Sequence, residues 1–115
     1  METAMSILKA LLEPAQETIV GHTVRIELID VAKPEEENLY NTLHEAMGKA
    51  GFRRTIQGKD GLEYRLPRAE YDYRDNGHPT TILEKARGAA EETNHKARIV
   101  VTCGVRYIAG LDQDK

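Results

Sequence analysis

The chain has 115 residues and a 40% apolar content, which suits one domain with one hydrophobic core. Its 16 basic and 19 acidic residues give a net charge of -3. This balance excludes the bulk polyanion binding of histone-like proteins, so any contact with nucleic acid must come from a local patch. The single cysteine, Cys103, excludes an intramolecular disulfide. Since we find no secretory signal and no apolar run of about 18 residues, we expect a cytoplasmic protein without a membrane segment.

The first predicted elements are a helix and a strand. Residues 1–18 carry apolar side chains at helical spacing, which predicts an N-terminal helix or extension outside the main domain. From His22 onward, apolar and polar residues alternate, and Val24, Ile26 and Leu28 share one side. This alternation predicts a first core strand with one solvated face.

Two longer helices are predicted further along the chain. Pro34 begins the first, with three glutamates in its first turn that complement the positive end of the helix dipole. Its buried stripe consists of Leu39, Leu43, Ala46, Met47 and Ala50. Gly51 stands where a left-handed residue typically ends a helix. The second helix is predicted from about residue 78 to residue 93, with Thr81 and Glu84 at capping-box spacing.

The segment 51–73 between these helices predicts a hairpin. Asp60 and Gly61 supply the turn, and the residues that follow alternate in the manner of a half-buried strand. The alternation changes phase at Pro67, which predicts a bulge or bend. The last apolar run begins at Ile99 and is β-rich.

The element order is therefore strand, helix, strand, strand, helix, strand. This order predicts an α+β protein of the ferredoxin-like βαββαβ class, with both helices on one face of a four-stranded antiparallel sheet in the order 4-1-3-2. We expect this domain to cover residues 19–111, with a short fifth strand possible after Gly104 and a polar tail at residues 112–115. Arg54 shares a face of the second, edge strand with Phe52, so it is either an inward-pointing charge that protects the edge or a functional residue.

The hairpin region also concentrates basic and aromatic residues. The predicted RNA-binding residues are Arg53, Arg54, Lys59, Arg65 and Arg68, with Phe52, Tyr64, Tyr71 and Tyr73 interleaved. Cations for phosphates beside rings for base stacking are typical of proteins that bind single-stranded RNA. Nearby acidic residues dilute this pattern, and an ordinary mixed surface is the alternative interpretation. The chain has no glycine-rich phosphate loop, no paired-cysteine zinc motif and no nucleophile elbow.

Three stretches resemble a known family. They are VRIELID at residues 24–30, LYNTLHEAMGKAGFRRTI at 39–56 and DGLEYRLPRAEYDY at 60–73. They resemble the small proteins of bacteria and mobile elements grouped with the GhoS-type antitoxins of type V toxin–antitoxin systems, over about residues 22–110. The resemblance implies a ferredoxin-like fold akin to the small nuclease subunit of CRISPR adaptation. It also implies an endoribonuclease that acts on a toxin's messenger RNA.

The resemblance suggests candidate catalytic residues. The CRISPR-adaptation relatives have a candidate metal ligand at the end of the first strand, where this chain has Asp30; the alternative is a turn or helix-entry residue. If the protein cleaves RNA, one mechanism uses Mg²⁺ held by Asp30 from two protomers. The other is metal-independent attack by the ribose 2'-hydroxyl, assisted by Arg54 or Tyr64.

Two classes of function follow from the sequence. The first is an antitoxin-like protein that binds and cleaves single-stranded RNA. The second is a non-enzymatic, phage-encoded interaction module that grips a protein partner through a sheet edge or the N-terminal helix. We also expect a homodimer, because the apolar segment from Ile99 to Leu111 is longer than one strand needs and its second half is suited to extend a partner's sheet.

Overall fold

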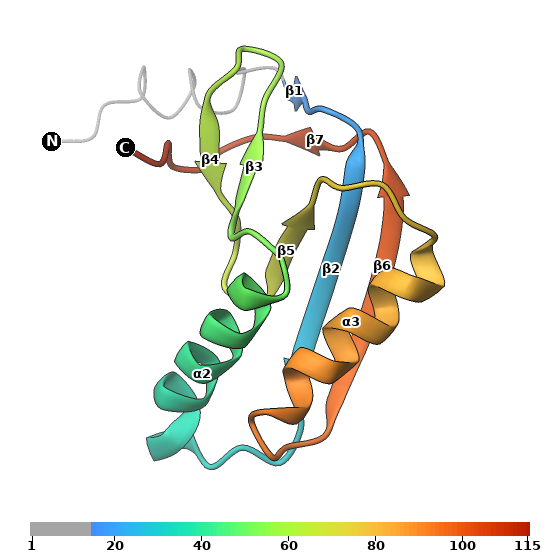
Figure 1. The fold of residues 1–115 in the computed structure, drawn as a ribbon. Coiled ribbons are helices and arrows are strands. Elements are labelled where there is room, and N and C mark those ends of the chain that lie inside the picture. The colour runs from blue at the N-terminus through green and yellow to red at the C-terminus, as the bar shows by residue number, and fades with distance from the viewer. Residues whose placement is uncertain (1–14) are drawn as a thin grey trace, which may run out of the picture.

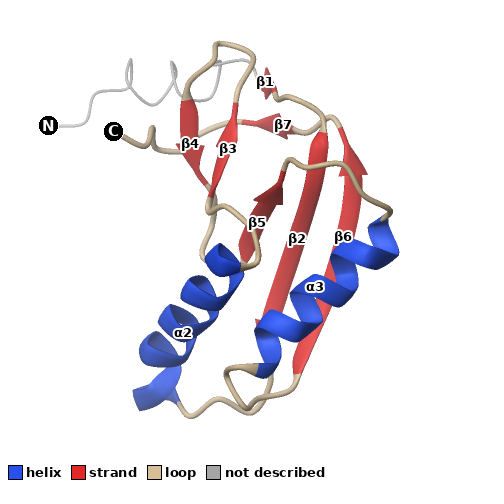
Figure 2. Ribbon diagram, viewed as in Figure 1, coloured by secondary structure: helices blue, strands red, loops and turns tan. Residues whose placement is uncertain are grey.

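The computed structural model describes residues 15–115 and shows a mixed α+β protein (Figure 1). The central antiparallel sheet has the order β5–β2–β6, formed by Glu70–Tyr73, Gly21–Leu28 and Ala97–Gly104. Two helices, α2 (Glu36–Lys49) and α3 (Pro79–Glu91), lie on one face of this sheet (Figure 2). No helix in the described part is long and apolar enough to cross a membrane. Most of the N-terminal helix or extension predicted over residues 1–18 lies outside the described range. Its last residues are described and contain a short strand, Gln16–Glu17, so the boundary of the domain predicted at residue 19 is wrong.

Strand β2 is the centre of the core. Val24, Ile26 and Leu28 are buried on the helix-covered face, as the alternation predicts. Val24 lies between Tyr71 of β5 and Val101 of β6 in the strand register. Val24 is paired on both sides, and Ile26 and Leu28 pair with β6. The apolar residues of β2 thus pack under the helices while strand pairing satisfies backbone polar groups.

The two helices form close to the predicted positions, but α2 begins at Glu36, and Pro34 lies in the preceding 3-10 helix, Lys33–Glu35. The buried residues of α2 include Leu43, Ala46 and Met47 of the predicted stripe, and Gly51 ends the helix with a φ of 94°. Tyr40, outside that stripe, is also buried, and its hydroxyl accepts a hydrogen bond from the backbone N–H of Leu28 at 3.1 Å. This bond ties α2 to the end of β2.

Helix α3 is capped by a residue other than the predicted one. The ring Nδ1 of His78 accepts a hydrogen bond from the backbone N–H of Thr80 at 3.2 Å, and Pro79 occupies the first helical position. The expected capping box of Thr81 and Glu84 is therefore wrong. Proline at the first position already fixes the entry of the chain, so the preceding residue becomes the cap.

The hairpin forms a sheet of its own. Strand β3 (Thr55–Gln57) pairs with β4 (Glu63–Arg65), and Gly61 in the loop has a φ of 83°. The central sheet of the described chain has three strands, and β3 reaches it only through the bridge between Arg53 and Asp72. The predicted single strand after the turn is divided at Pro67, so that β4 pairs with the hairpin and β5 pairs with β2.

The continuous alternation predicts that Arg54 points into the core, but it does not. Its side chain is exposed, whereas Phe52 and Ile56 on either side are buried. The regular strand begins only at Thr55, so the irregular backbone before it turns the guanidinium out to solvent. The interpretation of Arg54 as an inward-pointing charge is therefore wrong.

The ends of the described chain meet at the hairpin. A third small sheet joins β1 (Gln16–Glu17) to β7 (Tyr107–Ile108), the predicted short strand after Gly104. The segment expected to extend a partner's sheet thus pairs within its own chain. The residues predicted as a polar tail also pair, because the Asp112 carbonyl accepts from the backbone N–H of Arg65 at 2.8 Å.

A buried ion network connects the three sheets. Asp72 of β5 is 0% exposed, and its two carboxylate oxygens accept from Arg106 at 2.7 Å and from Arg74 at 3.0 Å. Arg106 also donates to the hydroxyl of Thr23 at 3.0 Å, and Arg74 bonds Glu63 on β4. A buried charge is tolerated only when it is paired and hydrogen-bonded, so the burial of Asp72 depends on these two arginines.

Removing one partner of Asp72 should therefore destabilise the protein strongly. We expect Arg106→Ala to lower the free energy of unfolding by about 3 kcal/mol, because a buried carboxylate loses one of its two guanidinium partners. Urea denaturation of both proteins measures the difference. Arg98→Ala is the matched control, because the exposed Arg98–Glu27 pair should contribute less than about 1 kcal/mol. An equal effect of the two variants would show that the network does not hold the sheets together.

Candidate functional site

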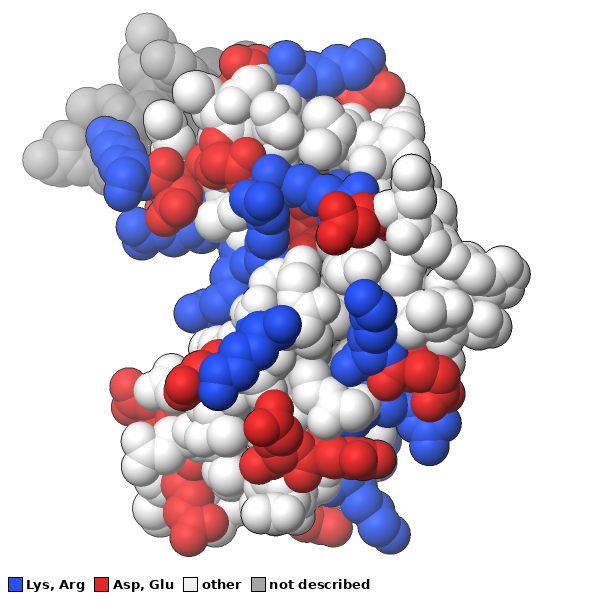
Figure 3. Space-filling model, in the orientation of Figure 1, with Lys and Arg blue, Asp and Glu red and all other residues white. Residues whose placement is uncertain are grey.

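The predicted RNA-binding residues do not form one uninterrupted basic patch. Basic and acidic side chains are interspersed over this face of the molecule (Figure 3). Three of the five predicted residues form ion pairs with carboxylates: Lys59 with Glu17, Arg65 with Asp114, and Arg68 with Glu36. All three pairs are at least partly exposed, so each is weak and exchanges readily for another anion.

The other two residues, Arg53 and Arg54, are exposed and form no ion pair within residues 15–115. The charge of Arg53 lowers the pKa of Glu63, after the larger effect of Arg74, so it already acts on a neighbouring carboxylate. Arg54 lines an open cavity of about 450 Å³ together with Thr55, Arg65, Leu66 and Asp114. Figure 3 shows the left side of the molecule hollowed below the hairpin, with basic side chains on the wall.

The aromatic part of the predicted site is mostly unavailable. Phe52, Tyr71 and Tyr73 belong to the core, where the rings of Phe52 and Tyr73 lie 4.9 Å apart. They therefore cannot stack on bases. Tyr64 is partly exposed, but its hydroxyl donates to Asp60 Oδ2 at 2.5 Å and accepts from Gln16.

Asp30 lies apart from the other predicted catalytic residues. It follows the end of β2 with a φ of 57°, and the loop from β2 to α2 is at the opposite end of the sheet from the hairpin (Figure 1). No group of three or more His, Cys, Asp or Glu suited to a metal ion is found in the described part of the chain. One exposed carboxylate is too few ligands for a magnesium site, so Asp30 would need a second protomer to supply others.

The structure brings together a cluster that the sequence did not indicate. Nδ1 of His44 on α2 lies 2.6 Å from the hydroxyl of Tyr71 on β5, and the two ring centres are 5.7 Å apart. Tyr40, one turn earlier on α2, is 6.4 Å from His44 and lies under the guanidinium of Arg68 at 4.1 Å. Only the spacing of Tyr40 and His44 was visible in the sequence, because Tyr71 comes from a distant strand.

Two cations act on this cluster. Burial, followed by the charges of Arg54 and Arg68, lowers the pKa of His44 to about 4. Burial also raises the pKa of Tyr71 well above its usual range. At neutral pH the cluster therefore holds a neutral imidazole and a neutral phenol beside two guanidinium groups. The neutral imidazole keeps one N–H, which can donate a hydrogen bond to an anion.

Comparison of the chain with protein families, with curated proteins and with solved structures found no match. The resemblance to GhoS-type antitoxins therefore stays a prediction from the three sequence stretches. Any functional assignment rests on that resemblance and on the geometry around Arg54 and His44.

The lowered pKa of His44 should make stability depend on pH. A histidine has a pKa of about 6.5 when unfolded, so between about pH 6.5 and pH 4 the unfolded chain binds the proton and the folded protein does not. The contribution is fully present above about pH 6.5 and is lost as the pH falls toward 4. We expect the urea midpoint to fall more between pH 7 and pH 5 in the wild type than in His44→Gln. Identical falls would show that His44 is not held neutral by folding.

Proposed function

We propose that the protein binds single-stranded RNA through the surface around Arg54, as an antitoxin-like protein of the cytoplasm. The observation that carries this proposal is the state of Arg54 itself. Its guanidinium is exposed, it lines a cavity of about 450 Å³, and it forms no ion pair in the described part of the chain. A cation without a protein counterion is ready to bind a phosphate group.

The neighbours of Arg54 support a patch of limited size. Arg53 precedes it, Arg65 lines the same cavity, and the charge of Arg68 acts on the same histidine. The ion pairs of Arg65 and Arg68 are partly exposed, so a phosphate competes with a carboxylate there at little cost. Together these residues suit a short stretch of backbone rather than a long duplex.

The finer description of the fold belongs to the same proposal. The sheet order β6–β2–β5 is compatible with strands 4, 1 and 3 of the expected ferredoxin-like order. Arg53 and Asp72 exchange two backbone hydrogen bonds of 2.8 Å, which is where a fourth strand would pair with β5. We therefore propose a ferredoxin-like protein whose second strand bends away after this bridge to form the hairpin.

The second candidate is an interaction module that uses a sheet edge. Strand β6 has eight residues and pairs only with β2 among the described strands. Its Val100 is 60% exposed. A long edge strand with an exposed apolar residue is suited to pair with another chain, either a protein partner or a second copy.

The RNA proposal predicts a specific dependence on salt. We expect Arg54→Ala to lower the magnitude of the slope of log Kobs against log[salt] by about 0.7, because one phosphate contact is lost. Fluorescence anisotropy with a short single-stranded RNA at several salt concentrations measures this slope. Arg98→Ala, on another surface, is the control that should leave the slope unchanged. If the wild type does not bind, or Arg54→Ala binds with an unchanged slope, the proposal fails.

The same mixtures test cleavage. The pure protein is incubated with a panel of single-stranded RNAs with and without EDTA, and the products are separated on a gel. Cleavage that EDTA abolishes supports the Mg²⁺ mechanism with Asp30, which Asp30→Asn should then also abolish. Cleavage that survives EDTA supports attack by the 2'-hydroxyl, with a terminal cyclic phosphate as the product.

The edge candidate predicts self-association. If β6 pairs with a second copy, equilibrium sedimentation at tens of micromolar should give a dimer, and Val100→Lys should give a monomer because a charged residue blocks an edge. Thr102→Lys, on the same exposed side of β6, provides a second position. A wild-type monomer at these concentrations would exclude pairing of β6 with a second copy, and only a different protein could then pair with this edge.

A further inference from the structure

The imidazole of His44 is held in one orientation. Its Nδ1 is 2.6 Å from the hydroxyl of Tyr71. The centre of the imidazole ring is 5.7 Å from the ring centre of Tyr71 and 6.4 Å from that of Tyr40. Tyr71 is 0% exposed, whereas His44 is partly exposed. Nδ1 is therefore turned toward the core, and Nε2 is the ring nitrogen that does not contact Tyr71.

The bond to Tyr71 also fixes the tautomer. A buried hydroxyl needs an acceptor for its proton, and within residues 15–115 the Tyr71 hydroxyl has one hydrogen-bond partner, Nδ1 of His44. A neutral imidazole has one acceptor nitrogen and one donor nitrogen. If Tyr71 donates to Nδ1, the ring proton of His44 resides on Nε2.

That outward N–H is accessible to a ligand. Among the described side chains, the one buried nitrogen or oxygen without a hydrogen-bond partner is Nδ1 of His22. Nε2 of His44 forms no hydrogen bond with the described part of the chain, so it must reach the solvent. It is a hydrogen-bond donor at a fixed position, and no described group accepts from it.

The surroundings of this donor favour an anion. The two charges that lower the pKa of His44 are both positive, from Arg54 and Arg68, and add to the larger effect of burial. Arg68 is fixed above the ring of Tyr40 at 4.1 Å and uses one nitrogen, Nη2, for Glu36 at 3.1 Å. Its other N–H groups have no partner within residues 15–115. A fixed neutral donor with a guanidinium held against the adjacent ring of Tyr40 matches the oxygens of a phosphate.

We propose that Arg54, Arg68 and the Nε2–H of His44 together bind one phosphate group of a single-stranded RNA, with Tyr71 as the positioning residue that fixes the tautomer of His44. This inference rests on the proposed RNA binding and names the group that the site receives. His44 contributes direction rather than charge, whereas the two arginines contribute charge. The phosphate chemistry is shared by free phosphate and by RNA, so both serve as probes.

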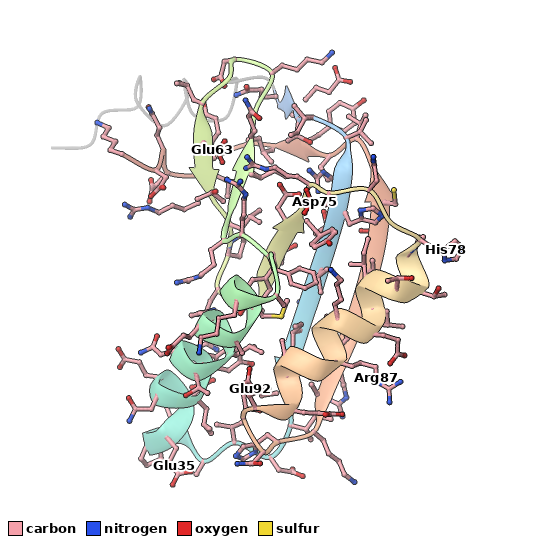
Figure 4. All side chains as sticks on the ribbon, in the orientation of Figure 1. Glu35, Glu63, Asp75, His78, Arg87 and Glu92 are labelled. Atoms are coloured by element: carbon pink, nitrogen blue, oxygen red, sulfur yellow. The ribbon has the colours of Figure 1, made fainter. Side chains whose placement is uncertain are left out.

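Nuclear magnetic resonance of the ¹⁵N-labelled protein tests the tautomer and the ligand. In the free protein at pH 7, the histidine ¹⁵N shifts should show protonated Nε2 and unprotonated Nδ1 for His44. Addition of inorganic phosphate or a short single-stranded RNA should shift these resonances and raise the pKa of His44 by about one, because a nearby anion stabilises the imidazolium. His78, exposed at the start of α3 (Figure 4), is the internal control and should not shift.

Three variants separate the roles in the cluster. His44→Phe should weaken RNA binding by at least about tenfold, since a hydrogen bond to a charged group is lost. His44→Gln should bind nearly as the wild type does, because an amide can accept from Tyr71 and donate outward. Tyr71→Phe should leave a mixture of tautomers in the ¹⁵N spectrum and weaken binding by a few-fold. A backbone ¹H–¹⁵N spectrum verifies that each variant is folded.

The outcomes distinguish this inference from the proposed function. If RNA binds with the expected salt slope and neither phosphate nor RNA moves His44, the phosphate site is wrong and RNA binding stands. If phosphate moves His44 and RNA does not bind, the site stands as a site for a small phosphate ligand and the RNA proposal fails. If His44→Gln binds as weakly as His44→Phe, or Nδ1 carries the proton, the role of the Nε2–H as a donor is overturned.

Discussion

The buried carboxylate of Asp72 is the constraint on which the arrangement of the three sheets depends. Arg106 and Arg74 hold its two oxygens, and the same arginines reach Thr18 beside β1 and Glu63 on β4. A charged carboxylate without such partners is too costly to bury, so the sheets must meet around it. Strands of two or three residues are too short to be stable alone. Here the ion network gives them fixed positions.

The network also determines which charges remain available to a ligand. It uses Arg74 and Arg106 internally, so two of the arginines near the hairpin add nothing to the surface patch. The backbone bridge at Arg53 places the next residue, Arg54, at the point where the chain leaves the central sheet for the hairpin. From there the charge of Arg54 acts on His44 and Tyr71. The candidate site is thus a consequence of how the hairpin is attached to the sheet.

Local patterns in the sequence predicted local structure well. The alternation at Val24 and the apolar stripe of α2 each depend on neighbouring residues, and both were confirmed. The exposed position of Arg54 was missed because a period-2 pattern assumes a strand that is regular at every residue. The network was missed for a different reason. Asp72 and Arg106 are 34 residues apart, and no periodicity tells which acid and which base meet.

The His44 cluster offers a source of affinity for RNA that the count of basic residues does not show. Three of the five predicted cations already have carboxylate partners, so Arg53 and Arg54 alone would give a salt slope of only about 1.4 on a single strand. Counterion release of this size gives weak binding. Affinity must then come from directed hydrogen bonds, and the rings of Phe52 and Tyr73 are buried and cannot add stacking. The neutral Nε2–H of His44, held in place by Tyr71, can direct a hydrogen bond to a phosphate oxygen without adding charge.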